Sequence, residues 1–319
     1  MMLAPRDAPM RRRLYIAGGV LDPALGESRR VPAMEPGVLM LRLLPVLGAL
    51  ALASIVEVVL PLRRQSRRSN GRLATNLWLL GITLTLAMGL NFLLALGAEY
   101  IRQSSGGLLQ LAGLGAAVSF VVALLALDAA TYLVHRLMHQ IPLLWRVHLV
   151  HHIDAAVDAT TAFRQHPIEG VLRFSFLAAT AWALGAPPAA IAVYRLLGAL
   201  NSVLEHANIR VPRALDRVLV WWWVTPDMHK VHHSRDRAET DSNYANLFSF
   251  FDRLFRTFTP SSRGPFVHYG IRGYDTPTSQ SIGAVLLLPF RSPALHSRSS
   301  PALRSATSAG ASHDRRSET

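Results

Sequence analysis

Histidine is the residue type whose spacing in this sequence could do chemistry. Eight of the 13 histidines fall in three short clusters: His135 with His139, His148 with His151 and His152, and His229 with His232 and His233. Positions i and i+3 or i+4 lie on one face of a helix, so the rings of each cluster can point the same way. Neutral imidazole binds iron, zinc, copper and nickel, and the clusters therefore predict a transition-metal site.

The number of imidazoles favours two metal ions over one, because a structural zinc takes only four ligands. The sequence has no cysteine, which excludes disulfides, zinc–thiolate sites and iron–sulfur clusters made from its own side chains. The HExxH motif of zinc proteases and the Glu-x-x-His pairs of carboxylate-bridged di-iron bundles are also absent. These observations predict a dinuclear centre held by histidine.

Four further residues are candidates for this centre. His206 is predicted as a ninth metal ligand, with a buried, hydrogen-bonded histidine as the alternative. His166 precedes Pro167, which favours an extended backbone, and its role as a ligand or a neighbour of the ligands stays open. Asp128 or Asp227 is expected to orient a metal-bound ring by accepting its second N–H, with helix capping or solvent exposure as the alternative for each.

Long apolar segments must position these residues. Three runs, at 43–61, 75–97 and 107–127, are each near the ~20 residues that a bilayer-spanning helix needs. Five arginines and no acid separate the first two runs, namely Arg63, Arg64, Arg67, Arg68 and Arg72. This basic loop predicts a cytoplasmic position, and it could also attract acidic lipid head groups or an acidic redox partner.

A later apolar pair, at 171–186 and 189–205, is split by Pro187 and Pro188. We predict a re-entrant helical hairpin there, followed by a cytosolic cap over residues 206–258. The run Trp221, Trp222 and Trp223 in this cap is typical of anchoring at a membrane interface, with the mouth of a substrate tunnel as the alternative.

Composition supports a membrane protein. Half of the residues are hydrophobic and the mean hydropathy is +0.25, which excludes a disordered chain. The formal net charge is +13, but the arginines flank apolar segments and fill the tails, a pattern that argues against nucleic-acid binding. The sequence therefore predicts an all-α integral membrane protein with about three transmembrane helices, a re-entrant helical hairpin, and a cytosolic helical cap that carries the histidine boxes on the cytoplasmic face.

These predictions divide the chain into four segments. Residues 1–36 are expected to be a disordered leader or an over-long gene start, with Met34 or Met40 as the true beginning. Residues 37–127 are expected to hold the transmembrane helices and residues 128–258 the histidine-box catalytic region with its hairpin. Residues 259–319 are expected to be a largely disordered tail, because their end is rich in serine and arginine.

The histidine clusters stand within longer motifs. The motif residues are Asp128, Tyr132, His135, Arg136 and His139; Trp145, His148, His151 and His152; Arg164, His166, Pro167 and Glu169; Glu205, His206, Ala207 and Asn208; Pro226 to Ser234; Asn243 and Tyr244; and Asp252, Arg253, Phe255, Thr257 and Phe258. With these motifs, residues 55–258 resemble the fatty acid hydroxylase/sterol desaturase superfamily of integral-membrane oxygenases. Phe251 and Arg256 stand where that family usually has Trp and Gly, which bears on local packing.

The resemblance implies two non-haem irons, O2 as co-substrate, and hydroxylation or desaturation of a lipid such as a sterol, a fatty acyl chain or an isoprenoid. The chain has no convincing flavin or dinucleotide motif, which predicts a separate reductase with a ferredoxin or cytochrome b5-like electron donor. Two other functions stay open: a membrane metal-binding or transport protein, and a zinc-dependent membrane hydrolase.

Overall fold

The computed structural model describes residues 15–16, 19–20, 36–64, 71–104 and 106–291. The two short strands, β1 (Tyr15–Ile16) and β2 (Gly19–Val20), pair antiparallel. The long helices are α1 (Pro36–Val59), α2 (Arg72–Gln103), α4 (Ala116–Gln140), α6 (Pro167–Leu184) and α7 (Pro188–His206). The shorter ones are α3 (Leu108–Leu111), α5 (Pro142–His152), η1 (Ala159–Phe163), α8 (Arg213–Leu219), α9 (Pro226–His232), α10 (Arg237–Thr240), α11 (Phe250–Leu254), η2 (Ser261–Phe266) and α12 (Ile282–Arg291).

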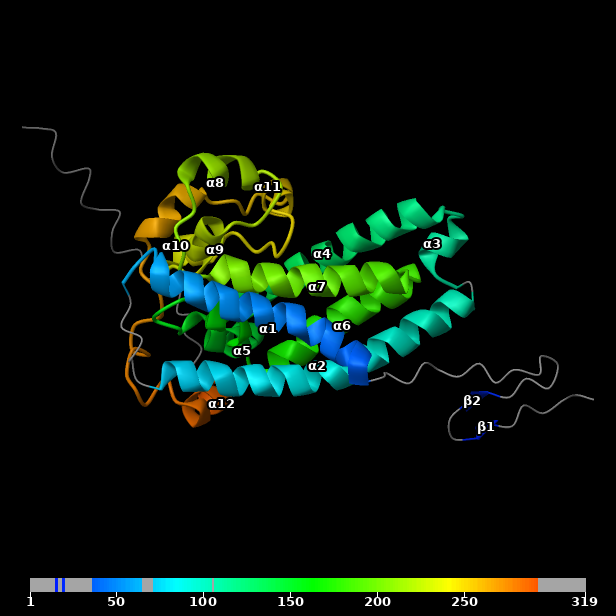
Figure 1. Cartoon of the computed structure of the whole chain (residues 1–319), viewed down its shortest axis with the longest axis horizontal. Helices are drawn as coiled ribbons and strands as arrows, with labels where there is room; N and C mark the ends of the chain where they lie inside the picture. Colours follow the sequence, from blue (N-terminus) through cyan, green and yellow to red (C-terminus); the bar gives the residue numbers. More distant parts are fainter. Residues whose placement is uncertain (1–14, 17–18, 21–35, 65–70, 105, 292–319) are drawn as a thin grey trace, which may run out of the picture.

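The long helices form a bundle with the short elements gathered at one end (Figure 1). Helices α5, α8, α9 and α10 lie at that end, whereas α3 and the end of α2 lie at the other. We call the elements around α5 and α8 to α12 the cap. The predicted predominance of helices is confirmed, and the predicted leader falls almost wholly outside the described residues.

Two helices among the described residues are long and apolar enough to cross a membrane: Arg72–Leu111, counted through α3, and Ala116–Gln140. Within the first predicted run, the described part of α1 contains the apolar stretch Leu43–Val59. The third run is divided differently from the prediction, because Gly113 adopts a left-handed conformation (φ 64°) and α4 begins only at Ala116. Helix α4 then continues unbroken to Gln140, so one helix is both a candidate span and the carrier of the first histidine cluster.

The turns at the far end of the bundle hold the helices together. Gln110 donates its side-chain N–H to the Gly185 carbonyl at 2.9 Å, which joins α3 to the turn between α6 and α7. A Cβ on Gly107 would lie 2.5 Å from the Gly185 Cα, so this contact requires glycine. Helices α6 and α7, joined by a short turn, cover the segment of the predicted hairpin, and the re-entrant hairpin itself stays a prediction.

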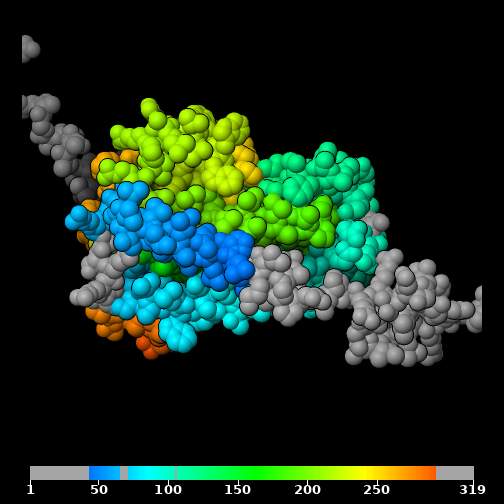
Figure 2. Space-filling model, viewed as in Figure 1, coloured from blue at the N-terminus to red at the C-terminus, as the bar shows by residue number. Residues whose placement is uncertain are grey.

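Helix α1 is attached to the cap by its one acidic residue. Glu57 is buried, and its Oε1 accepts from the backbone N–H groups of Ala159 (2.8 Å) and Asn208 (2.7 Å). The opposite side of α1 exposes large apolar side chains, including Leu52 and Ile55. Figure 2 shows α1 lying across this face of the molecule with no described helix over it.

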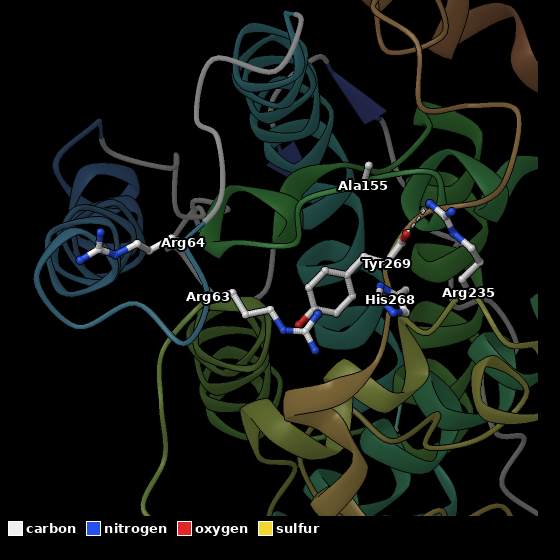
Figure 3. A pocket seen from close by; sticks show the side chains of 6 residues that line it. All are labelled: Arg63, Arg64, Ala155, Arg235, His268 and Tyr269. Atoms are coloured by element: carbon white, nitrogen blue, oxygen red, sulfur yellow. Dashed lines mark hydrogen bonds between the residues drawn. The ribbon is translucent and has the colours of Figure 1, made fainter.

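The basic loop contributes directly to the cap. Arg72 is buried at the start of α2 and pairs with Asp154 at 3.0 Å, so it is an internal ion pair and not a solvated loop cation. Arg63 donates to the carbonyls of Pro265 (3.2 Å) and Val267. Beside it lies a pocket of ≈ 250 Å³ (Figure 3), where Arg235 is likewise held by backbone carbonyls and by Asp275.

The expectation of a largely disordered tail was wrong for residues 259–291. Helix α12 packs Val285 and Leu288 against Leu149 and Val150 of α5, the helix that carries the second histidine cluster. In the sequence, this short apolar helix is masked by the serine and arginine content of the residues that follow it. Residues 292–319 lie outside the described residues.

Candidate metal centre

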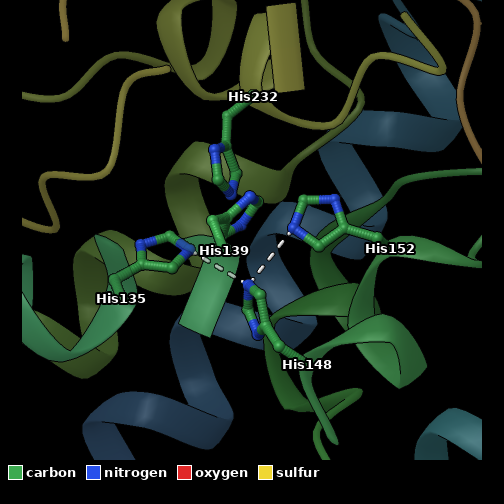
Figure 4. Close-up of side chains that lie close together, drawn as sticks. All are labelled: His135, His139, His148, His152 and His232. Carbon is green, nitrogen blue, oxygen red and sulfur yellow. Dashed lines mark hydrogen bonds between the residues drawn. The ribbon is translucent and has the colours of Figure 1, made fainter. Parts of the chain in front are cut away.

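Nine buried histidines from four helices converge at the cap end of the bundle. They form two groups, in each of which one ligand nitrogen per ring lies within 4.8 Å of the others. The five-histidine group contains His135, His139, His148, His152 and His232 (Figure 4). The four-histidine group contains His151, His206, His229 and His233. These nine residues are the nine that the sequence analysis proposed as metal ligands.

The two HxxHH clusters divide between the groups in opposite ways. In α5, His148 and His152 belong to the five-histidine group and His151 to the four-histidine group. After Thr225, His229 and His233 belong to the four-histidine group, whereas His232 joins the five-histidine group. The rings of the two groups are therefore neighbours, and the ring centroids of His152 and His233 are 4.8 Å apart.

Local sequence starts these helices at the required places. Pro142 opens α5 and Pro226 opens α9, each at a position where the missing N–H is not needed. Thr225 caps α9 by accepting from the Met228 N–H. Behind α9, η2 approaches so closely that a Cβ on Gly264 would lie 2.1 Å from the Asp227 carbonyl oxygen.

Six of the nine rings have Nδ1 within 2.7–3.3 Å of a carbonyl or carboxylate oxygen. These oxygens only accept hydrogen bonds, so the hydrogen-bond network places the ring proton on Nδ1 and leaves Nε2 as a lone pair. The backbone acceptors are Tyr244 for His135, Arg164 for His151, Ser202 for His206 and Ser242 for His232. The carboxylate acceptors are Glu169 for His148 (3.0 Å) and Asp241 for His139 (3.3 Å).

The free Nε2 atoms face one another. The Nε2–Nε2 distance is 3.1 Å between His135 and His148, and 3.1 Å between His151 and His206. Both nitrogens of each pair are then acceptors, and two lone pairs at this distance repel unless a cation lies between them. Two nitrogens at about 2.1 Å from one metal ion and at right angles lie about 3.0 Å apart, so the spacing suits shared coordination.

Two buried nitrogens support the same conclusion. Nε2 of His139 and Nε2 of His232 have no hydrogen-bond partner among the described residues, although both are fully enclosed. A buried polar atom without a partner is uncommon in a folded protein and calls for a missing ligand. The donor set is entirely imidazole nitrogen, which fits iron or another late first-row metal.

Burial favours the neutral form of several rings, among them His151, His229 and His232. Desolvation, followed by the electrostatic effect of His148, lowers the pKa of His232 to about 3. Desolvation and then His206 hold the pKa of both His151 and His229 well below the usual range. Neutral imidazole is the form that binds metal, so the cap supplies ligands that need no deprotonation at physiological pH.

The predicted role of the two aspartates is not the one their contacts show. The Asp128 carboxylate accepts from the backbone N–H groups of Leu247 (3.2 Å) and Phe248 (2.9 Å) and from the Tyr194 hydroxyl (3.3 Å). Asp227 lies 3.6 Å from the Lys230 ammonium. The described hydrogen bonds of these carboxylates do not reach a ring of either histidine group: Asp128 is bonded to the backbone of the cap, and the described partner of Asp227 is Lys230.

His166 is buried but belongs to neither group. Its Nδ1 accepts from the Ile168 N–H at the start of α6, and its Nε2 lies 3.2 Å from the Leu286 carbonyl of α12. His206, by contrast, is central to the four-histidine group, with Nε2 at 3.0–3.1 Å from three other rings. Glu205 is close by, with Oε1 3.8 Å from the His229 Nε2.

Sequence reasoning missed the groups that orient the rings. Glu169 appeared only as part of a family motif, and Asp241 lies eight residues beyond the third cluster with no pattern to mark it. Trp145 also encloses the five-histidine group, with ring centroids 4.9 Å from His139 and 5.3 Å from His152. The spacing of Trp145 to His148 and His152 as i+3 and i+7 was the signal for it.

Comparison with known proteins agrees with this geometry. The model of the fatty acid hydroxylase family matches residues 120–257, which include the whole histidine centre. Over these residues the chain is similar to the members of this family. Its relatives include alkylglycerol monooxygenase of Xenopus tropicalis, 32% identical over 149 residues, which are 46% of this chain and 31% of the relative. The human alkylglycerol monooxygenase is 31% identical over 137 residues, or 43% of this chain and 29% of the relative.

The bacterial ornithine lipid hydroxylase of Rhizobium tropici is 29% identical over 161 residues, or 49% of this chain and 46% of that protein. The chain thus spans about a third of the length of the alkylglycerol monooxygenases that it matches and just under half of the bacterial hydroxylase. No solved structure matches the chain. The named relatives are enzymes that act on lipids. The region that matches the family model holds the nine histidines.

Proposed function

We propose that this chain is an integral-membrane di-iron oxygenase that hydroxylates a C–H bond of a membrane lipid with O2 and electrons from a separate donor. The observation that carries the proposal is the pair of buried all-histidine groups with facing, unprotonated Nε2 atoms. Five imidazoles in one group exceed the four ligands of a structural zinc. The similarity to the fatty acid hydroxylase family then favours iron over the other metals that imidazole binds.

In this proposal the nine histidines bind the two irons. When bound, a pair of irons supplies the power to activate O2 and to remove hydrogen from an unactivated carbon. Glu169 and Asp241 orient His148 and His139, while backbone carbonyls fix four more rings. Trp145 and the apolar residues around the rings keep water away, so the chain's own task is orientation and exclusion of solvent.

Helix α4 explains how a lipid could meet the centre. It exposes Val118, Val121 and Leu125 near its beginning and carries His135 and His139 near its end. At about 1.5 Å per residue, His135 lies about 21 Å along the axis from Val121. A lipid chain that lies along α4 beside Val121 would have to extend over about this distance to bring a carbon to the irons.

The cytoplasmic position of the centre is part of the proposal. Arg63, from the basic loop, is bonded to Pro265 and Val267 of the cap, so loop and histidine centre lie on the same side. Basic loops favour the cytoplasm, where reduced electron carriers are available. A ferredoxin or cytochrome b5-like protein with its reductase is the proposed donor, because the sequence has no cysteine for an iron–sulfur cluster.

Hydroxylation is proposed over desaturation because the named relatives include a monooxygenase and a hydroxylase. Their substrates, as their names state them, are alkylglycerols and an ornithine lipid, both amphiphiles with polar heads. We propose a substrate of this kind, a polar lipid that remains in the membrane during the reaction.

Metal analysis of the purified full chain tests the proposal. We expect about two irons per chain in the wild type, one for each group. His139→Ala removes a ligand of the five-histidine group and His151→Ala a ligand of the four-histidine group, so each is expected to lose mainly one iron. His166→Asn is the matched control, since it changes a buried histidine outside both groups and keeps an acceptor for the α6 N-terminus.

Zinc alone in protein made in iron-replete cells, or iron content unaffected by both alanine variants, would overturn the proposal. With iron in place, the reaction itself is tested with ¹⁸O2, a ferredoxin and its reductase, and vesicles containing alkylglycerol or ornithine lipid. One labelled oxygen atom in the product is expected. An unlabelled product with a new double bond would replace hydroxylation with desaturation.

A further inference from the structure

One exposed surface of the cap is apolar and basic at once. Helix α8, the turn after it, and α11 expose seven large apolar side chains. These are Leu215, Val218, Leu219, Trp221, Trp222, Leu254 and Phe255. Trp222 is 71% exposed and Val218 67% exposed. We call this surface the α8–α11 face; single exposed apolar residues are common in soluble proteins, but a continuous set of this size marks a contact surface.

The charges on this face have a single sign. Arg210, Arg213, Arg217 and Arg256 are exposed around it. The two acids in the same segments are withdrawn, because Asp216 is buried against Thr225 and Ser261 and Asp252 against the backbone of Tyr244 and Ala245. Residues 209–223 and 250–258 therefore present arginine and no exposed acid to a partner.

Arg253 lies within the apolar face and is shaped by it. Its guanidinium stacks 4.7 Å from the Trp221 ring centroid and 3.9 Å from that of Phe258. Stacking covers the apolar side of the guanidinium and leaves its edge for an anion. The face therefore combines aromatic rings with basic head groups, as surfaces that lie in the head-group region of a membrane do.

The α8–α11 face is continuous with the candidate span α4. Phe255 stacks on Tyr132 of α4 with ring centroids 5.1 Å apart, and the next residue of α4, Leu133, is itself exposed. Figure 2 shows the yellow-green and gold surface of this part of the cap meeting the green surface of α4 along one edge. A bilayer around α4 would thus reach this face without a break.

We propose that the α8–α11 face lies on the surface of a bilayer that contains anionic lipids, so that the cap is held against the same membrane that α4 enters. Its tryptophans and leucines occupy the head-group boundary, and its arginines bind lipid phosphates. The proposal does not depend on metal binding or catalysis. Arg63 and Arg235 of the pocket in Figure 3 are not part of this proposal, because Arg63 donates to backbone carbonyls and Arg235 to a carbonyl and to Asp275.

The absence of cysteine makes the test direct. Val218→Cys, labelled with an environment-sensitive fluorophore, reports on the face, and Ala238→Cys, at an exposed position of α10, reports on the charged side of the cap. Both proteins are placed, as full chains, in nanodiscs of phosphatidylcholine with or without phosphatidylglycerol. We expect iodide in the water to quench the label at 218 about fivefold less than the label at 238, and spin-labelled lipid to quench only the former.

The role of the arginines is tested by adding Arg213→Gln and Arg217→Gln to the labelled Val218→Cys protein. In phosphatidylglycerol discs we expect each arginine change to weaken contact about fivefold, so lipid quenching falls to the level seen in pure phosphatidylcholine. Equal iodide quenching at both positions overturns the proposal. A label at 218 protected from iodide and from spin-labelled lipid alike also overturns it, because the face is then covered by a second copy of the chain. If the arginine substitutions leave quenching by spin-labelled lipid unchanged, binding of anionic lipid by this face is overturned.

Discussion

The contact between Glu169 and His148 gives the sharpest test of how the centre is built. Glu169 is 1% exposed, and its Oε1 accepts from the His148 Nδ1 at 3.0 Å and from the Arg173 Nε at 2.9 Å. In Glu169→Gln the amide oxygen keeps the position but loses the charge. A charge-assisted hydrogen bond is about twice as strong as a neutral one, and its net value is about 1.5–3 kcal/mol.

The expected loss is therefore about 1–2 kcal/mol, which weakens iron binding to the five-histidine group about 5- to 30-fold. The measurement is release of iron from the loaded protein into increasing concentrations of an iron(II) chelator. We expect one iron to leave at about tenfold lower chelator concentration than in the wild type, while the iron of the four-histidine group is unaffected. The two irons can be distinguished in this assay because Glu169 contacts only His148 among the nine rings, and His148 belongs to the five-histidine group.

Asp128→Asn is the matched comparison, because Asp128 is also a buried carboxylate of the bundle but accepts from backbone N–H groups. We expect it to lower the unfolding temperature and to leave both irons at wild-type affinity. If Glu169→Gln released neither iron more readily, or if Asp128→Asn released one selectively, the assignment of the ring-orienting carboxylate would be refuted.

Two further substitutions test the cap. In Gly264→Ala the new Cβ meets the Asp227 carbonyl oxygen at 2.1 Å, so we expect a loss of about 1–3 kcal/mol in unfolding free energy and reduced iron in the four-histidine group. Gly283→Ala, where nothing lies within 4 Å, is the control, and thermal unfolding with iron analysis measures both. Burial raises the pKa of Asp252 to about 6, against ~3.9 unfolded, so its ionisation opposes folding by about 3 kcal/mol. This stability of the wild type is fully present below pH ~4 and is lost as the pH rises through about 6. Over this pH range the unfolding temperature of Asp252→Asn is therefore expected to rise by about 6 °C relative to that of the wild type. A pH-independent difference between the two proteins would contradict this shift.

The helices and the nine histidines could be predicted because they leave periodic signals. The i, i+3 and i+4 spacing identifies a shared helix face without knowledge of the fold, and apolar runs reveal long helices by length alone. The ends of the helices were harder to predict from the sequence. Helix α4 extends to Gln140 and continues through the break that was expected after residue 127. Helix α12 was missed because ten residues of apolar sequence between polar neighbours give a weak signal.

The partners of the histidine rings could not be predicted, and the reason is physical. Four of the six Nδ1 acceptors are backbone carbonyls, which every residue possesses and which become specific only through the fold. Asp128 looked like a ring partner because it shares a helix face with His135 and His139. Its carboxylate instead satisfies two N–H groups at Leu247 and Phe248, and this contact links positions about 120 residues apart.

The opposite division of the two HxxHH clusters follows from helix geometry. At 3.6 residues per turn, positions i and i+4 differ by about 40° around the axis, whereas i+3 and i+4 differ by about 100°. The outer two histidines of a cluster can therefore share one ion, and the middle one turns towards a second. Helix α5 gives its outer pair to the five-histidine group, and α9 with His233 gives its outer pair to the four-histidine group. Two such clusters facing each other build two adjacent sites, and each needs only one further helix: α4 completes the first with His135 and His139, and α7 the second with His206.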